Sequence, residues 1–170
     1  MKRDYSSINR AKLVDEPIVE MLLTKKYTNS DITFARADIK MDYEGVDIIC
    51  YSSGTKKFIN VKRNSSKHYR SPNFSISLDK NKLDTFKSTS FAFIDETADS
   101  VYFVDGSALL TYILENSSKS TVSQYNPNKL WIVIPKTDTV LLSSSVIKYN
   151  KNVAKLLELG RDESQFADLF

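Results

Sequence analysis

The sequence contains one cysteine, Cys50, and one histidine, His68. A single cysteine excludes an internal disulfide bond, and the apolar pattern around Cys50 favours a buried, unreactive thiol. One histidine leaves too few ligands for a zinc site of histidine and cysteine, and too few bases for Ser–His or Cys–His catalysis. We therefore expect any chemistry of this protein to rest on carboxylates and lysine.

Long apolar segments are also missing. No apolar run approaches the roughly 18 residues of a membrane-spanning helix, and the first segment, MKRDYSSINR, lacks the apolar stretch of a signal peptide. We therefore expect a cytoplasmic protein with no membrane partner. The chain has 170 residues, of which 41% are hydrophobic, and this predicts a single domain over residues 1–170 with a substantial core.

Acidic residues are absent between Ile48 and Leu78, where six basic residues occur. These are Lys56, Lys57, Lys62, Arg63, Lys67 and Arg70. Such a basic stretch can follow the phosphates of a nucleic acid. A solvated loop whose charge is balanced by acids elsewhere in the fold is an equally good interpretation.

Periodicity and turn residues predict a mixed α/β fold, with a mixed central sheet flanked by helices. Helices are expected over about 17–26, around Leu83 and Phe86, over 106–116 with Ser107 as N-cap, and over about 151–159. A long polar connection is expected over 117–128. Strands are expected over 32–37, 46–51, 56–63, 74–78, 90–95, 100–105, 130–135 and 139–142.

The segment GVDIICYSSGTKKFINVKRN, residues 45–64, reads as a β-hairpin that carries three unexpected polar residues. If its loop closes over two or four residues, Asp47 lies directly opposite Asn60. Lys62, two residues further along, shares their face of the sheet. A three-residue loop with a bulge at Gly54 would shift this register by one position.

Both faces of this hairpin carry apolar side chains, so its polar groups are expected to be largely removed from water. Buried polar groups destabilise a fold by several kcal/mol unless they are hydrogen-bonded. The three residues could therefore form a stabilising network in which Asp47 accepts hydrogen bonds from Asn60 and Lys62. They could equally form a functional site.

The strings GVDII and FINVK, which supply Asp47, Asn60 and Lys62, resemble the core motif of the PD-(D/E)XK nuclease superfamily. That motif has an aspartate at the start of one strand and an acidic residue, any residue and a lysine on the next. The order of the expected elements over about 13–115 is also similar to that of the superfamily. The resemblance implies a restriction endonuclease-like core, extended by strand and helix over about 129–170.

The resemblance implies metal-dependent hydrolysis of phosphodiester bonds, with DNA as the expected substrate. A Mg²⁺ or Mn²⁺ ion would be held by oxygens of Asp47, of Asn60 and of the main-chain carbonyl of Val61. Lys62 would orient or deprotonate the attacking water, or stabilise the developing negative charge. An upstream helix adds a glutamate in several branches of the superfamily, and Glu20 matches that position. The basic residues Lys56, Lys57, Arg63, Lys67 and Arg70 would then lie along a nucleic-acid groove.

Position 60 departs from the motif, because it is asparagine where glutamate, aspartate or glutamine is usual. One negative charge is therefore missing, and we expect weaker metal binding, although an amide oxygen still coordinates a hard cation. Glu20 would lie about 140° from the centre of the apolar stripe of its helix, which indicates an exposed side chain. Other acids that could compensate are Asp38, Asp42 and Glu44.

Three functions remain open at this point. The first is a metal-dependent DNA endonuclease, and the second is a nucleic-acid-binding protein that keeps the nuclease fold without its activity. The third is a protein-interaction module whose segment QFADLF docks to a partner through Phe166, Leu169 and Phe170; packing of this segment on its own domain is the alternative. A homodimer is compatible with each of them.

Overall fold

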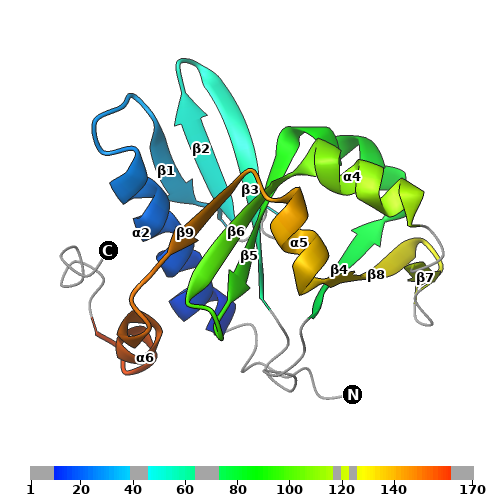
Figure 1. Ribbon diagram of the computed structural model, residues 1–170. Coiled ribbons are helices and arrows are strands. Elements are labelled where there is room, and N and C mark those ends of the chain that lie inside the picture. The colour runs from blue at the N-terminus through cyan, green and yellow to red at the C-terminus, as the bar shows by residue number, and fades with distance from the viewer. Residues whose placement is uncertain (1–9, 39–45, 64–72, 117–119, 123–125, 162–170) are drawn as a thin grey trace.

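The computed structural model describes residues 10–38, 46–63, 73–116, 120–122 and 126–161. They form a mixed α/β fold with one large and one small β-sheet (Figure 1), which confirms the predicted fold class. The large sheet has the strand order β1-β2-β3-β5-β6-β9, and the small one has the order β4-β8-β7. In the large sheet β3 and β5 run parallel, whereas the other neighbouring strands are antiparallel.

The strands of the large sheet are β1 (Thr33–Arg36), β2 (Ile48–Ser52), β3 (Thr55–Arg63), β5 (Thr89–Asp95), β6 (Ser100–Asp105) and β9 (Ser145–Lys148). Those of the small sheet are β4 (Asn73–Asp79), β7 (Ser120–Val122) and β8 (Lys129–Pro135). The helices are η1 (Ala11–Asp15), α2 (Glu16–Lys26), η3 (Lys80–Ser88), α4 (Gly106–Glu115), α5 (Lys136–Leu142) and α6 (Asn152–Glu158). None of these helices is both long and apolar enough to cross a membrane.

The hairpin of β2 and β3 has the register predicted for an even-numbered loop. Ile49 pairs with Phe58, and Tyr51 pairs with Lys56. The loop consists of Ser53 and Gly54, both of which have positive φ angles. Two positive φ angles define the type I′ turn, whose twist matches that of the two strands, and this turn fixes the register.

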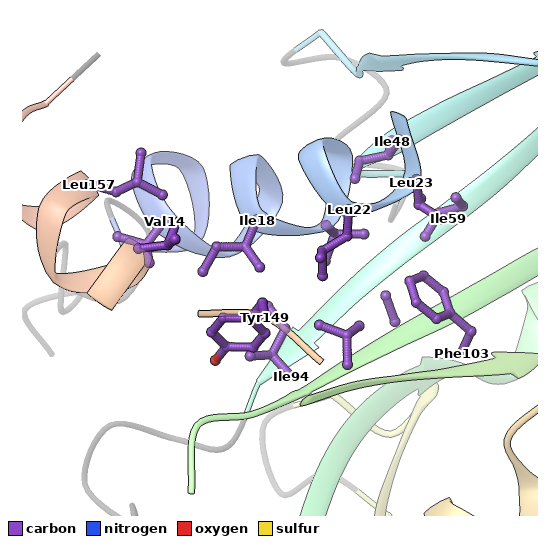
Figure 2. Packing of buried hydrophobic residues seen from close by; sticks show 14 residues of the cluster. Val14, Ile18, Leu22, Leu23, Ile48, Ile59, Ile94, Phe103, Tyr149 and Leu157 are labelled. Carbon is purple, nitrogen blue, oxygen red and sulfur yellow. The ribbon is translucent and has the colours of Figure 1, made fainter. Parts of the chain in front are cut away.

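The large sheet separates two hydrophobic clusters. The helix-side cluster lies under η1, α2 and α6, and Figure 2 shows its side chains pointing from these helices toward the strands. Its buried members are Val14, Ile18, Val19, Leu22, Leu23, Ile48, Ile59, Ala92, Ile94, Val101, Phe103, Tyr149, Val153 and Leu157. Because each such side chain contributes about 1.5 to 3 kcal/mol by leaving water, this cluster fixes α2 on the sheet.

The second cluster, here the sheet-side cluster, lies between the large sheet and β4, β8, η3 and α4. Its buried members are Phe74, Ile76, Leu78, Phe86, Phe91, Phe93, Tyr102, Val104, Leu109, Ile113, Ile132 and Ile134. Successive side chains of a strand point to opposite faces. Ile59 and Val61 therefore face the helix-side cluster, whereas Asn60 and Lys62 face the side on which the small sheet lies.

Three predictions in the second half of the chain were wrong. The connection predicted over 117–128 contains the strand β7 (Ser120–Val122). The segment 139–142, predicted as a strand, belongs to helix α5, and the strand β9 follows it at Ser145. Pro135 precedes α5, and the Thr139 hydroxyl donates to the Pro135 carbonyl at 3.1 Å. Leu141 is 84% exposed, so its apolar character gave a misleading strand signal. The predicted N-cap of α4, Ser107, lies inside the helix, which begins at Gly106 after Asp105.

Candidate functional site

Asp47 lies immediately before β2, and its carboxylate completes the hydrogen bonding of β3. Its main-chain nitrogen donates to the Ile59 carbonyl at 3.0 Å, and its carbonyl accepts from Ala37 at 2.9 Å. The side-chain oxygen Oδ2 accepts a hydrogen bond from the main-chain nitrogen of Val61 at 2.6 Å. The carboxylate therefore takes the position that a main-chain carbonyl of β2 would take if the strand continued.

Asn60 and Lys62 lie on either side of Val61 in β3, and their side chains share one face of the sheet. Asn60 is 7% exposed, and Lys62 is half-buried. The parallel strand β5 places Phe91 beside Asn60 and Phe93 beside Lys62. The register of the hairpin ends at the pair Ile48–Ile59, so the predicted direct pairing of Asp47 with Asn60 is not part of the ladder. Asp47 reaches this part of β3 through its hydrogen bonds to Ile59 and Val61.

A pocket of about 230 Å³ lies between this part of β3 and the small sheet. Asn60 and Lys62 form one wall of the pocket. The other walls come from β4, η3, the start of β5 and the start of β8, through Ile76, Ser77, Leu78, Asp79, Lys82, Thr85, Phe86, Thr89, Phe91 and Lys129. The two motif residues of β3 are therefore accessible from a polar cavity.

Glu20 is on α2, the helix that covers the opposite face of the large sheet. Its Oε2 lies 2.9 Å from Nε of Arg36 on β1, and its side chain is 25% exposed. Arg36 pairs with Ile48 in the sheet. The ion pair thus connects Glu20 to the strand end next to Asp47, from the helix side rather than from the pocket.

The predicted basic residues do not form one surface in the described part of the chain. Lys56 and Lys57 are exposed near the tip of the hairpin, where the Lys56 ammonium lies 5.7 Å from the Tyr51 ring centre. The Arg63 side chain is 8% exposed, with Nε 3.1 Å from Asp15 Oδ2 and Nη1 3.0 Å from Glu96 Oε1. Arg63 is therefore held in a buried ion network.

Several other residues singled out in the sequence lie outside the described residues. These are Asp42, Glu44, Lys67, His68, Arg70, Phe166, Leu169 and Phe170.

The buried ion network was not foreseen from the sequence. Burial raises the pKa of Asp15 to about 7, although the positive charge of Arg10 lowers it; the charges of Glu96 and Glu16 raise it further. Arg10 also pairs with Glu96 and with Glu158 of α6. This network joins η1, β3 and α6 on the helix side of the sheet, and its contacts indicate a structural role.

Carboxylate, amide and main-chain carbonyl oxygens are the ligands that suit a hard cation such as Mg²⁺. The Asp47 carboxylate lies beside the Val61 main chain, and the carbonyl of a strand residue points to the same edge as its amide. Asn60 can add a neutral amide oxygen. No group of three or more histidine, cysteine, aspartate or glutamate residues suited to a metal occurs among the described residues.

No family model and no curated protein sequence matches this chain. Among solved structures, the chain is similar to D212, a nuclease from a fusselovirus, with 13% sequence identity and a TM-score of 0.44. The similarity covers 93% of each chain.

Proposed function

We propose that this protein is a metal-dependent nuclease of the PD-(D/E)XK type that hydrolyses phosphodiester bonds of DNA. The observation that carries the proposal is the position of Asp47, whose carboxylate is bonded to the main chain between Asn60 and Lys62. The type I′ turn aligns β2 with β3 as far as Ile48 and Ile59, and the main-chain bond from Asp47 to the Ile59 carbonyl places Asp47 just beyond that pair. Apart from the asparagine at position 60, the hairpin carries the residue types of the motif, which supports the proposal.

Each motif residue has a role that suits its chemistry. Oxygens of Asp47, Asn60 and Val61 would hold Mg²⁺ or Mn²⁺, and such an ion supplies Lewis-acid activation of water and of the phosphate. The Lys62 ammonium, in the wall of the pocket, stabilises negative charge that develops on a phosphate oxygen. Asn60 orients the substrate phosphate from the same wall through its amide group.

Substitution of Asn60 by glutamate tests the proposal directly. Asn60→Glu restores the missing charge next to Asp47, so Mn²⁺ binding should tighten and plasmid nicking should accelerate. Asp47→Ala should abolish both. Calorimetric titration with Mn²⁺ and a plasmid-nicking assay measure the two effects. Asn152→Glu on α6 and Asp31→Ala, both at exposed positions, are matched controls that should leave nicking unchanged.

A second function, nucleic-acid binding without cleavage, is favoured by the single carboxylate of the donor set. In that case Asn60→Glu places two carboxylates close together without a firmly held ion, which raises the pKa of one and destabilises the fold. If metal-dependent cleavage is absent from wild type and from Asn60→Glu while DNA affinity is retained, the nuclease proposal is wrong and this second function replaces it.

A further inference from the structure

Three lysines from three separate elements line the pocket beside Asn60. Lys62 comes from β3, Lys82 from η3 and Lys129 from the start of β8. Among the described residues of the pocket, Asp79 is the one acid, and its Oδ1 accepts a hydrogen bond from the Asn81 nitrogen at 2.9 Å at the start of η3. The excess of positive charge favours an anionic occupant such as a phosphate.

The size of the pocket limits what can enter it. A volume of about 230 Å³ is below that of a typical site for a drug-sized ligand, which is roughly 300 to 1,000 Å³. Such a pocket can receive a phosphate and part of its nucleotide. It is too small for a duplex, whose bases and second strand would have to remain outside.

The outer face of the small sheet continues from this pocket and presents an aromatic ring. Trp131 on β8 is 46% exposed. It pairs directly with Ser77 of β4, and Ser77 itself lines the pocket. Residues paired in this way have Cβ atoms about 4.5 to 5.5 Å apart. The side chain of Trp131 therefore lies next to Ser77, a residue of the pocket wall.

The neighbours of Trp131 leave its ring open to a ligand. Lys129 and Val133 lie on the same face of β8, because side chains alternate along a strand. Their partners on β4 are Asp79 and Ser75. On β4 the small Ser77 stands opposite Trp131 and does not provide a large side chain that would cover the indole, and on the other side, on β7, Trp131 pairs with Thr121.

We infer that the pocket and Trp131 together bind an unpaired nucleic-acid strand. Its phosphates lie against Lys82 and Lys129, and one of its bases stacks on the indole ring of Trp131. A base in a duplex already has neighbours on both faces, whereas an unpaired base can stack on an aromatic side chain. This inference rests on the proposed function, because the strand enters the same pocket that Asn60 and Lys62 line, and it specifies single-stranded or frayed substrate.

The test measures binding without metal, in EDTA, so that it does not depend on cleavage. Trp131 is the one tryptophan of the sequence, and its fluorescence therefore reports on this site alone. Oligothymidylate should quench the emission and protect the ring from acrylamide, whereas a blunt duplex of the same length should do so at least tenfold more weakly.

Variants separate the base contact from the phosphate contacts. With labelled oligothymidylate and anisotropy, Trp131→Ala should weaken binding by about tenfold or more, and Trp131→Phe should retain most of the affinity. The double variant Lys82→Ala/Lys129→Ala should reduce the salt-dependence slope by about 1.4, at about 0.7 per phosphate contact on a single strand. Leu141→Ala and Lys25→Ala, at exposed positions on α5 and α2, are controls that should change neither value.

The inference is overturned if oligothymidylate gives no acrylamide protection in the wild-type protein, or if the duplex protects Trp131 equally. Unchanged affinity of Trp131→Ala, with its thermal unfolding intact, also overturns it. The acrylamide measurement on the wild-type protein gives an answer even if a variant fails to fold. Plasmid nicking is measured separately. If nicking is absent while oligothymidylate binding is retained, the proposed nuclease activity is wrong, whereas the proposed binding site for an unpaired strand stands.

Discussion

The Asp47 carboxylate and the main-chain nitrogen of Val61 are joined by a hydrogen bond of 2.6 Å. This bond gives Asp47 a structural task in addition to the proposed chemical one, because it satisfies a strand amide at the place where β2 begins. Loss of activity after removal of Asp47 is therefore ambiguous by itself. A pair of substitutions can separate the two tasks.

Asp47→Ala leaves the Val61 amide without this acceptor, and we expect the free energy of unfolding to fall by about 1 to 3 kcal/mol. Asp47→Asn keeps an oxygen in the same place, so it should retain most of the stability and still lose the charge needed for Mn²⁺. Urea denaturation and Mn²⁺ calorimetry on both variants make the comparison. Wild-type Mn²⁺ affinity in Asp47→Asn would show that the carboxylate charge has no part in metal binding.

Gly106, at the start of α4, packs against the main chain where η3 ends and β5 begins. A Cβ atom at this position would collide with the carbonyl oxygens of Phe86 and Thr89, both of which belong to residues of the pocket wall. We expect Gly106→Ala to lower the free energy of unfolding by about 1 to 3 kcal/mol and to weaken oligothymidylate binding. Ser107→Ala, at the exposed neighbouring position, should alter both measurements little, and equal effects of the two substitutions would contradict the prediction.

Asp15 should make stability depend on pH in a direction opposite to that of most carboxylates. Its pKa is raised by burial from 3.8 to about 7, so the native state binds this proton more tightly than the unfolded chain does. The stabilisation from this group is complete below about pH 4 and is lost as the pH rises toward 7. Relative to Asp15→Asn, the wild-type protein should therefore lose stability across this range.

Urea unfolding at a series of pH values measures this difference. Asp31→Asn, at an exposed position, is the control and should run parallel to the wild-type protein. A difference between wild type and Asp15→Asn that stays constant from pH 4 to 7 would show that Asp15 is ionised throughout, held so by Arg63.

The hairpin could be predicted from the sequence because its turn and its strand pairing depend on residues that are close together in the chain. A two-residue turn containing Gly54 and two alternating strands fix the pairing of β2 with β3 as far as Ile48 and Ile59. The mixed sheet and most helices follow from similarly local patterns. Helix α5 did not, because Leu141 is apolar and exposed, and periodicity cannot distinguish such a residue from one in a buried strand.

The pocket could not be predicted, because Lys62, Lys82 and Lys129 are far apart in the sequence and meet only through the packing of the small sheet on the large one. Arg63 illustrates the opposite error. It belongs to a basic run in the sequence, yet its partners Asp15 and Glu96 come from distant segments and remove it from the surface. The order of charges along the sequence therefore predicts neither the lysines of the pocket nor the buried ion network of Arg63.

The parallel pairing of β3 with β5 has a consequence for the order in which the site assembles during folding. The β2–β3 hairpin needs only a local turn and can form in about 1 to 10 μs, whereas β4 and η3 intervene between β3 and β5 and delay that contact through loop-closure entropy. In the parallel ladder the Ala92 amide is the one that faces the Asn60 carbonyl of β3. We therefore expect pulsed hydrogen exchange to show early protection of the Ile59 amide and later protection of the Ala92 amide; simultaneous protection would refute this order. A newly made chain would thus have the motif hairpin before it has a pocket to receive a strand.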